Sequence, residues 1–160
     1  TEQDIRKRIL VHLTTNSNAN LPASLSLMKI AKDAERLGDY VKNTFELHDM
    51  IVEKDMNDPL FERLFVDIGG EVTELLDAVN TAFRDSDADI GPELSEKGHG
   101  ISQRCEDVIT ELLSSDYSTR KTVALTLGSR YFKRIALHLA NISTSLYLPL
   151  PEIDYRQEDE

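Results

Sequence analysis

Basic residues are clearly outnumbered by acidic ones in this chain. The 160 residues include 18 Lys and Arg against 29 Asp and Glu, which gives a formal net charge of −11. Nucleic acids and anionic membrane surfaces are bound through basic patches. The shortage of basic residues therefore argues against both as the main partner.

Cysteine and long apolar runs are also scarce. Cys105 is the single cysteine, so no disulfide can form within the chain, as is typical of proteins from a reducing compartment. No apolar run approaches the roughly 20 residues of a membrane span, and no signal-peptide pattern opens the sequence. We therefore expect a cytoplasmic protein that is not inserted in a membrane.

Tryptophan is absent, and aromatic residues make up 6% of the chain, whereas hydrophobic residues as a whole make up 40%. This composition favours helices that pack through leucine, isoleucine, valine and alanine. The spacing of the apolar residues is helical through most of the sequence. It predicts an all-α, antiparallel helical bundle with helices near 2–13, 21–49, 59–84, 89–114 and 119–147.

Helix-start residues stand before four of these segments. Asn20 or Pro22 precedes or opens the second, and Asp58 with Pro59 opens the third. Asp89 is the expected N-cap of the fourth helix, and Ser118 or Thr119 that of the fifth. Gly69-Gly70 lies inside the third helix, where we expect close helix packing or a slight bend.

The second helix has a regular apolar stripe. Its members are Leu27, Ile30, Ala34, Gly38, Val41 and Phe45, and they predict the buried face of an amphipathic helix. Glu35 and Asp39 are i,i+4 neighbours on another side of the helix. Two stacked carboxylates repel each other unless a cation or a basic side chain lies nearby.

The sequence also repeats itself. Helix 22–49 can be aligned with helix 120–147 at an offset of 98 residues. This alignment pairs Leu27 with Leu125, Arg36 with Arg134, Leu37 with Ile135 and Asn43 with Asn141. The first helix aligns with helix 89–114 at an offset near 100. Helix 59–84 precedes the second unit and has no counterpart in the first. The chain thus divides into a partial repeat (1–50), a complete three-helix repeat (59–147) and an acidic tail (148–160).

Glu35-Arg-Leu-Gly-Asp39 and Arg130-Tyr-Phe-Lys-Arg-Ile135 resemble the signature helices of the PhoU family. The resemblance implies a bundle of PhoU-type three-helix repeats, the first of them incomplete. It also implies a regulatory adaptor in phosphate homeostasis that binds a phosphate transporter or its sensor kinase at the inner face of the membrane. A cytoplasmic regulatory domain of a sodium/phosphate cotransporter is a variant of the same reading.

The resemblance further implies a metal site at Glu35 and Asp39, because the family's Glu/Asp-x-x-x-Asp pattern is associated with surface metal ions. Iron, manganese, magnesium and zinc are the candidate ions. The alternative is an acidic patch paired with Lys32, Arg36 or Lys42. Lys133 and Leu137 stand where the family has acids in the second signature, so we expect at most one site.

Two other classes remain as alternatives. A carboxylate-bridged metalloenzyme of the helical-bundle type needs acids on several facing helices and Glu-x-x-His pairs, which the sequence lacks, so we expect no enzyme. A helical scaffold without metal is the second alternative.

Cys105 and His138 are expected as packed side chains. The face carrying Ile5, Ile9, Ile30 and Phe45 lacks a partner helix, so we expect either a homo-oligomer or packing onto the second repeat.

Overall fold

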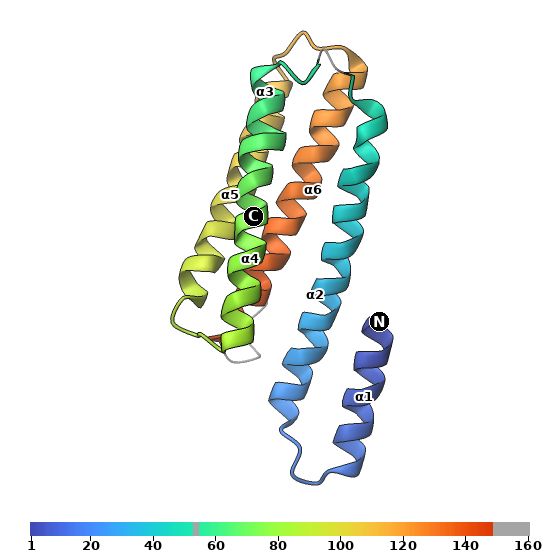
Figure 1. Ribbon diagram of the computed structural model, residues 1–160, viewed down its shortest axis with the longest axis vertical. Coiled ribbons are helices and arrows are strands. Elements are labelled where there is room, and N and C mark those ends of the chain that lie inside the picture. The colour runs from blue at the N-terminus through green and yellow to red at the C-terminus, as the bar shows by residue number, and fades with distance from the viewer. Residues whose placement is uncertain (53–54, 149–160) are drawn as a thin grey trace.

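The computed structural model describes residues 1–52 and 55–148, and this part of the chain contains five helices and no strand (Figure 1). The helices are α1 (Glu2–Thr15), α2 (Leu21–Glu46, extended by the 3₁₀ turn η1, Leu47–Met50), a composite third helix, α5 (Gly91–Leu112) and α6 (Thr119–Thr144). The composite helix consists of α3 (Pro59–Phe61), η3 (Glu62–Ile68) and α4 (Gly69–Asp85). The predicted all-α bundle is confirmed. From residue 149 on, the expected acidic tail lies outside the described residues.

Side-chain caps begin three of the helices where the sequence placed them. The Asn20 carboxamide oxygen accepts a hydrogen bond from the backbone N–H of Ala23, and Asp58 and Ser118 cap α3 and α6 in the same manner. The expected cap at Asp89 is wrong. Helix α5 begins one residue later with Ile90 as an N-cap that has no side-chain hydrogen bond, and Gly91 packs there against the ring of Tyr147.

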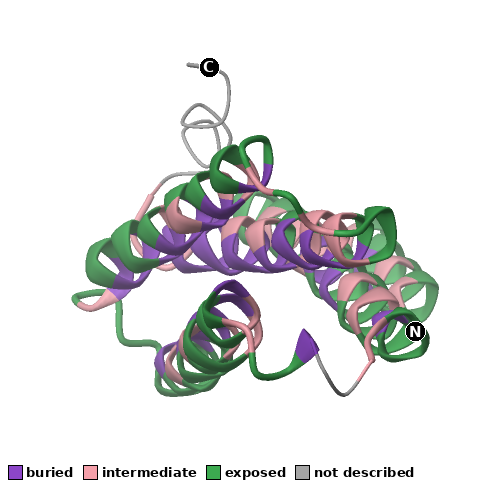
Figure 2. Cartoon of the chain, turned by 90° about the horizontal axis from the view of Figure 1, so that it is seen from above, coloured by how far each residue is buried: buried purple, intermediate pink, exposed green. Residues whose placement is uncertain are grey.

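Helix α6 lies at the centre of the bundle and packs against α5, α2 and α4. Helix α2 runs antiparallel to α6, and α1 packs mainly on α2, with the α1–α2 end extending beyond the other helices (Figure 1). Buried residues gather on the helix sides that face one another (Figure 2). The largest fully buried side chains are Leu64, Ile68, Leu75, Ile101, Leu125 and Leu139. The core therefore lies mainly between η3–α4, α5 and α6.

The two glycines of the third helix differ in their surroundings. A Cβ atom on Gly69 would lie 3.2 Å from Cζ of Phe132, whereas one on Gly70 would meet nothing within 4 Å. Close packing on α6 therefore accounts for Gly69. The residues just before it, Glu62–Ile68, form a π-helical stretch that the apolar spacing did not predict.

The predicted buried face of α2 is wrong in orientation. Val41 and Phe45 are 52% and 84% exposed, and Ala34 and Gly38 are exposed as well. The buried residues of α2 are instead Ala31, Asp33 and Leu37. The apolar stripe lies roughly a quarter turn away from the face that contacts α6. Helix α2 thus carries an apolar surface that the described residues leave open.

Candidate functional site

Glu35 and Asp39 both lie exposed on α2. Glu35 lines a shallow hollow together with Glu2 and Ile5 of α1. Lys42, one turn after Asp39, has its Nζ atom 3.6 Å from Oε1 of Glu46. Among residues 1–52 and 55–148, no three His, Cys, Asp or Glu side chains lie close enough to hold a metal ion. A cation at this pair would have to complete its coordination with water or with a second molecule. The metal assignment stays a prediction.

If the pair binds a cation, divalent metal should raise the melting temperature of the protein slightly, because the ion offsets the repulsion between two carboxylates about 6 Å apart. Titration with Mn²⁺, Fe²⁺, Mg²⁺ and Zn²⁺ by calorimetry measures this. The variant Glu35→Gln/Asp39→Asn keeps the shape of both side chains and should lose the effect. Equal metal binding by the wild type and this variant would contradict a metal site at Glu35 and Asp39.

Lys133 occupies the position that corresponds to Glu35 at the offset of 98. Its ammonium group forms an ion pair with Glu106 of α5, and Nη1 of Arg130 lies 3.9 Å from the same carboxylate. Lys133 therefore joins α6 to α5. Two basic groups around one acid leave no acidic surface at the second signature.

A buried polar pair joins α2 to α6. Nδ1 of His138 lies 3.0 Å from Oδ1 of Asp33, and the two residues are 6% and 7% exposed. The ring of Tyr40 stacks on the His138 ring with a centroid distance of 5.7 Å. The expectation of a packed, hydrogen-bonded His138 is confirmed. The sequence analysis did not identify its partner Asp33. The feature that could have indicated a buried Asp33 is its position one turn before Leu37, on the same face of α2.

The offset of 98 relates two contacts at this helix crossing. It carries Asp33 onto Tyr131 and Tyr40 onto His138. The contact between Asp33 and His138 therefore corresponds to a contact between Tyr131 and Tyr40, and those two rings lie 6.2 Å apart. Helices α2 and α6 thus meet in an approximately two-fold arrangement at this point.

An apolar groove runs between α2 and the composite third helix, with α6 as its floor. Its volume is about 520 Å³, and its walls include Val41 and Phe45 of α2 and Phe61, Phe65 and Leu76 of the third helix. Thr44, Thr73 and His48 contribute the side-chain polar groups of the lining. Such a surface suits the burial of apolar groups, not acid–base chemistry. The groove and the buried pair lie on adjacent faces of α2.

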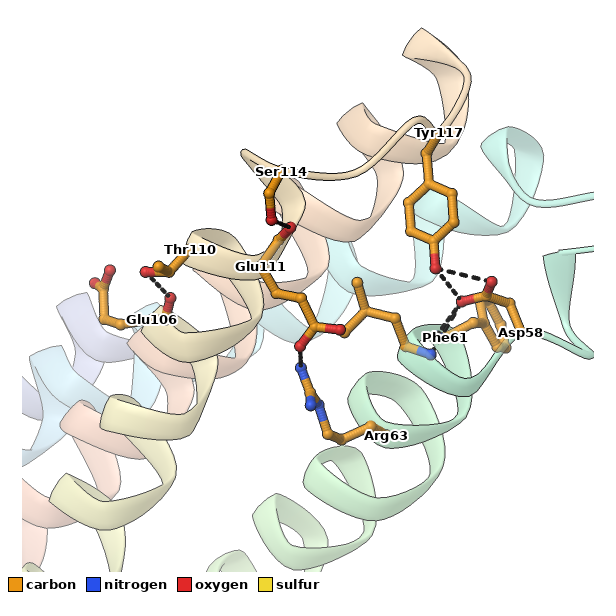
Figure 3. A network of polar contacts seen from close by, with 9 residues as sticks. Asp58, Phe61, Arg63, Glu106, Thr110, Glu111, Ser114 and Tyr117 are labelled. Atoms are coloured by element: carbon orange, nitrogen blue, oxygen red, sulfur yellow. Dashed lines mark hydrogen bonds and ion pairs between the residues drawn. The ribbon is translucent and has the colours of Figure 1, made fainter.

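The start of the third helix is held by a polar network (Figure 3). The hydroxyl of Tyr117 donates to Asp58, and Nζ of Lys121 lies 2.7 Å from the same carboxylate. Burial raises the pKa of the Asp58 carboxyl, but hydrogen bonds from Lys121, Tyr117 and the backbone N–H groups of Phe61 and Leu60 outweigh it. The pKa of Asp58 is therefore below its usual value.

The variant Asp58→Asn should lower the free energy of unfolding by about 1–2 kcal/mol near neutral pH, because it keeps the cap but loses the charged partner of Lys121. A carboxyl whose pKa is lowered by folding stabilises the fold above its unfolded pKa, about pH 4. That contribution is lost as the pH falls through the lower folded pKa, so the difference between variant and wild type should shrink there. Urea unfolding at several pH values measures it. Asp116→Asn, at an exposed acid, is the control, and a difference that grows in acid contradicts the assignment.

Cys105 is fully buried in α5. Burial raises its pKa to about 12, so the side chain stays a thiol at neutral pH. The expectation of a packed, apolar cysteine is confirmed.

No family model, no curated protein and no solved structure matches the chain. The resemblance to the PhoU family therefore rests on the residues quoted above. Within the described residues, no helix is both long enough and apolar enough to cross a membrane.

Proposed function

We propose that this protein is a regulatory adaptor in phosphate homeostasis, similar to PhoU proteins, and that it acts by binding a phosphate transporter or its sensor kinase. The observation that carries the proposal is the apolar groove between α2 and the third helix. Phe45 stands 84% exposed on its wall. An aromatic side chain beside a groove of this kind is a typical anchor for a protein partner.

The arrangement of α2 and α6 supports the same proposal. The reciprocal contacts of Asp33 with His138 and of Tyr40 with Tyr131 are those expected of two related helices that pack about a two-fold axis. This favours a tandem of PhoU-type repeats, in which α1–α2 corresponds to α5–α6. The composite third helix would complete the second repeat alone.

Metalloenzyme chemistry of the helical-bundle type is the weaker proposal. It requires carboxylates from several helices directed at one point, as in di-metal carboxylate proteins. In the described part of the chain, Glu71 is paired with Arg104, Glu106 with Lys133 and Glu74 with Lys97, so three of the acids near α5 already have basic partners.

The test is a phosphate-starvation reporter in the organism of origin. Cells that carry Phe45→Glu should express starvation genes in phosphate-rich medium, because the charged side chain prevents binding at the groove. Cells that carry Leu113→Glu should behave as the wild type, since Leu113 is equally exposed at 86% and lies at the end of α5. Normal repression by Phe45→Glu would contradict the proposal.

A further inference from the structure

The end of the α1–α2 hairpin differs in charge from the rest of the molecule. The chain as a whole has a formal net charge of −11, yet no acidic residue occurs in the segment 5–32. This segment includes most of α1, the connecting loop and the start of α2. Its basic residues are Arg6, Lys7, Arg8, Lys29 and Lys32. The acidity of the whole chain therefore conceals one basic end.

Two basic side chains of this end, Lys7 and Arg8, are exposed and form no ion pair in the described part of the chain. The acids of α1 lie in its first turn, at the end of the helix away from the connecting loop. Glu2 is paired there with Arg6, and Asp4 is the nearest acid to Lys7 and Arg8 along the helix. Two exposed cations thus face a single acid, and the hairpin end keeps a positive charge.

Large apolar side chains are exposed around the same end. They are Leu10 and Val11 of α1 and Leu21, Leu25 and Leu27 of α2, each between 40% and 54% exposed. Helix positions follow one another at about 100°, so Leu10 and Val11 point to different sides of α1, and Leu25 and Leu27 to nearly opposite sides of α2. Leu27 lines a hollow beside α1, whereas Leu25 points away from that hollow. The apolar residues therefore surround the hairpin end and do not form a single face.

We propose that the end of the α1–α2 hairpin binds the surface of a membrane that contains anionic lipids. The binding is peripheral, because within the described residues no helix is both long and apolar enough to cross a membrane. A folded protein partner would cover one face of the hairpin, whereas a lipid layer covers an inserted end on all sides. The inference concerns a different surface from the groove, so it goes beyond the proposed function and does not depend on it.

The order of residues along the hairpin matches the layers of a bilayer surface. At a rise of 1.5 Å per residue, the exposed leucines and Val11 lie within about 9 Å of the hairpin end, a depth that interfacial helices reach. Lys7 and Arg8 follow at about 10–12 Å, which brings them to the lipid phosphate groups when the leucines are inserted. The connecting loop 16–20 contains no charged residue, so its entry removes no charge from water.

The acidic remainder of the molecule determines how it approaches such a surface. The turn between α4 and α5 carries Asp85, Asp87 and Asp89 and lies at the same end of the bundle, but the α1–α2 hairpin extends beyond it (Figure 1). An anionic surface repels this turn and attracts the hairpin. The molecule therefore meets the membrane with the hairpin end first and with its acidic bundle directed away.

Lipid vesicles are the probe. One set contains phosphatidylcholine with about one third phosphatidylglycerol, and the matched set contains phosphatidylcholine alone. Co-sedimentation of the intact protein should show binding about tenfold or more tighter to the anionic vesicles, and this binding should weaken at high salt. Equal binding to the two sets would overturn the inference.

Charge reversal locates the binding surface. Lys7→Glu/Arg8→Glu should weaken binding to the anionic vesicles about tenfold or more, because two cations at the headgroup level become anions. Arg120→Glu/Arg134→Glu is the matched control. It changes the net charge by the same amount on α6 and should weaken binding no more than about twofold. All four positions are exposed, so thermal melting should show that both variants fold.

Tryptophan is absent from the chain, so a single introduced tryptophan reports its own surroundings. The emission of Leu21→Trp should shift to shorter wavelength when anionic vesicles are added, because the indole at the hairpin end leaves water. Leu113→Trp is the control, since Leu113 is 86% exposed at the C-terminal end of α5, outside the hairpin. Its emission should stay unchanged.

Three further results would overturn the inference. Undiminished vesicle binding by Lys7→Glu/Arg8→Glu, or an equal loss in the control variant, would mean that the hairpin is not the binding surface. Unchanged emission of Leu21→Trp on bound vesicles would mean that the hairpin end stays in water. Tight, salt-sensitive binding of polyglutamate without binding of anionic vesicles would identify an acidic protein as the partner instead.

Discussion

His138→Ala should lower the free energy of unfolding by about 3–5 kcal/mol, because it leaves the buried carboxyl of Asp33 without its partner and removes the ring that stacks on Tyr40. Chemical denaturation measures the change. The matched control is His48→Ala, since the His48 side chain is 82% exposed, and it should change stability by no more than about 0.5 kcal/mol.

A double-mutant cycle separates the polar contact from simple loss of packing. The double variant Asp33→Ala/His138→Ala should be more stable than the sum of the two single changes indicates, with a coupling energy of about 1–3 kcal/mol. Additive effects would mean that the two side chains stabilise the fold independently, and the pair would then not fix how α2 crosses α6.

Gly98→Ala should destabilise the protein by about 1–3 kcal/mol, although alanine is the better helix former. Its Cβ atom would lie 2.8 Å from the backbone oxygen of Ala136 and 2.9 Å from Cβ of Ala140, so α5 and α6 would have to move apart. Thermal and urea unfolding measure the loss.

Gly38→Ala is the matched change on α2. A Cβ atom there would meet nothing within 4 Å, so this variant should gain about 0.5–1 kcal/mol from the helix preference of alanine. The two glycine substitutions should therefore act in opposite directions. A gain at Gly98, or a loss at Gly38, would contradict the packing described for these helices.

The positions of the helices could be predicted from the sequence because local chemistry determines them. The caps at Asn20, Asp58 and Ser118 and the helical spacing of apolar residues act within a few turns of chain. The start of α5 escaped prediction because no side chain caps it. The π-helical stretch Glu62–Ile68 escaped as well, because apolar residues at 60, 61, 64, 65 and 68 fit an ordinary α-helix, although the buried ones, Leu60, Leu64 and Ile68, recur every four positions.

The orientation of α2 could not be predicted in the same way. An apolar stripe shows that a face prefers burial, but it does not show which neighbour is available to bury it. Helix α2 turns Asp33 and Leu37 toward α6 and leaves Val41 and Phe45 on the wall of the groove. The pairing of Asp33 with His138 joins residues 105 positions apart, which no local pattern indicates. The sequence therefore indicated an apolar stripe and an uncovered face at Phe45, but not the groove that this face forms with the third helix.

Photo-crosslinking from position 45 tests most directly whether the groove is the binding surface of a phosphate-regulatory adaptor. A photoreactive phenylalanine analogue replaces Phe45 in phosphate-replete cells, and the same analogue at position 113 is the control. The expected result is a crosslink from position 45, and not from position 113, to a phosphate-transporter subunit or its sensor kinase, identified by mass spectrometry. The same products from both positions, or no product from position 45, would contradict a binding role for the groove.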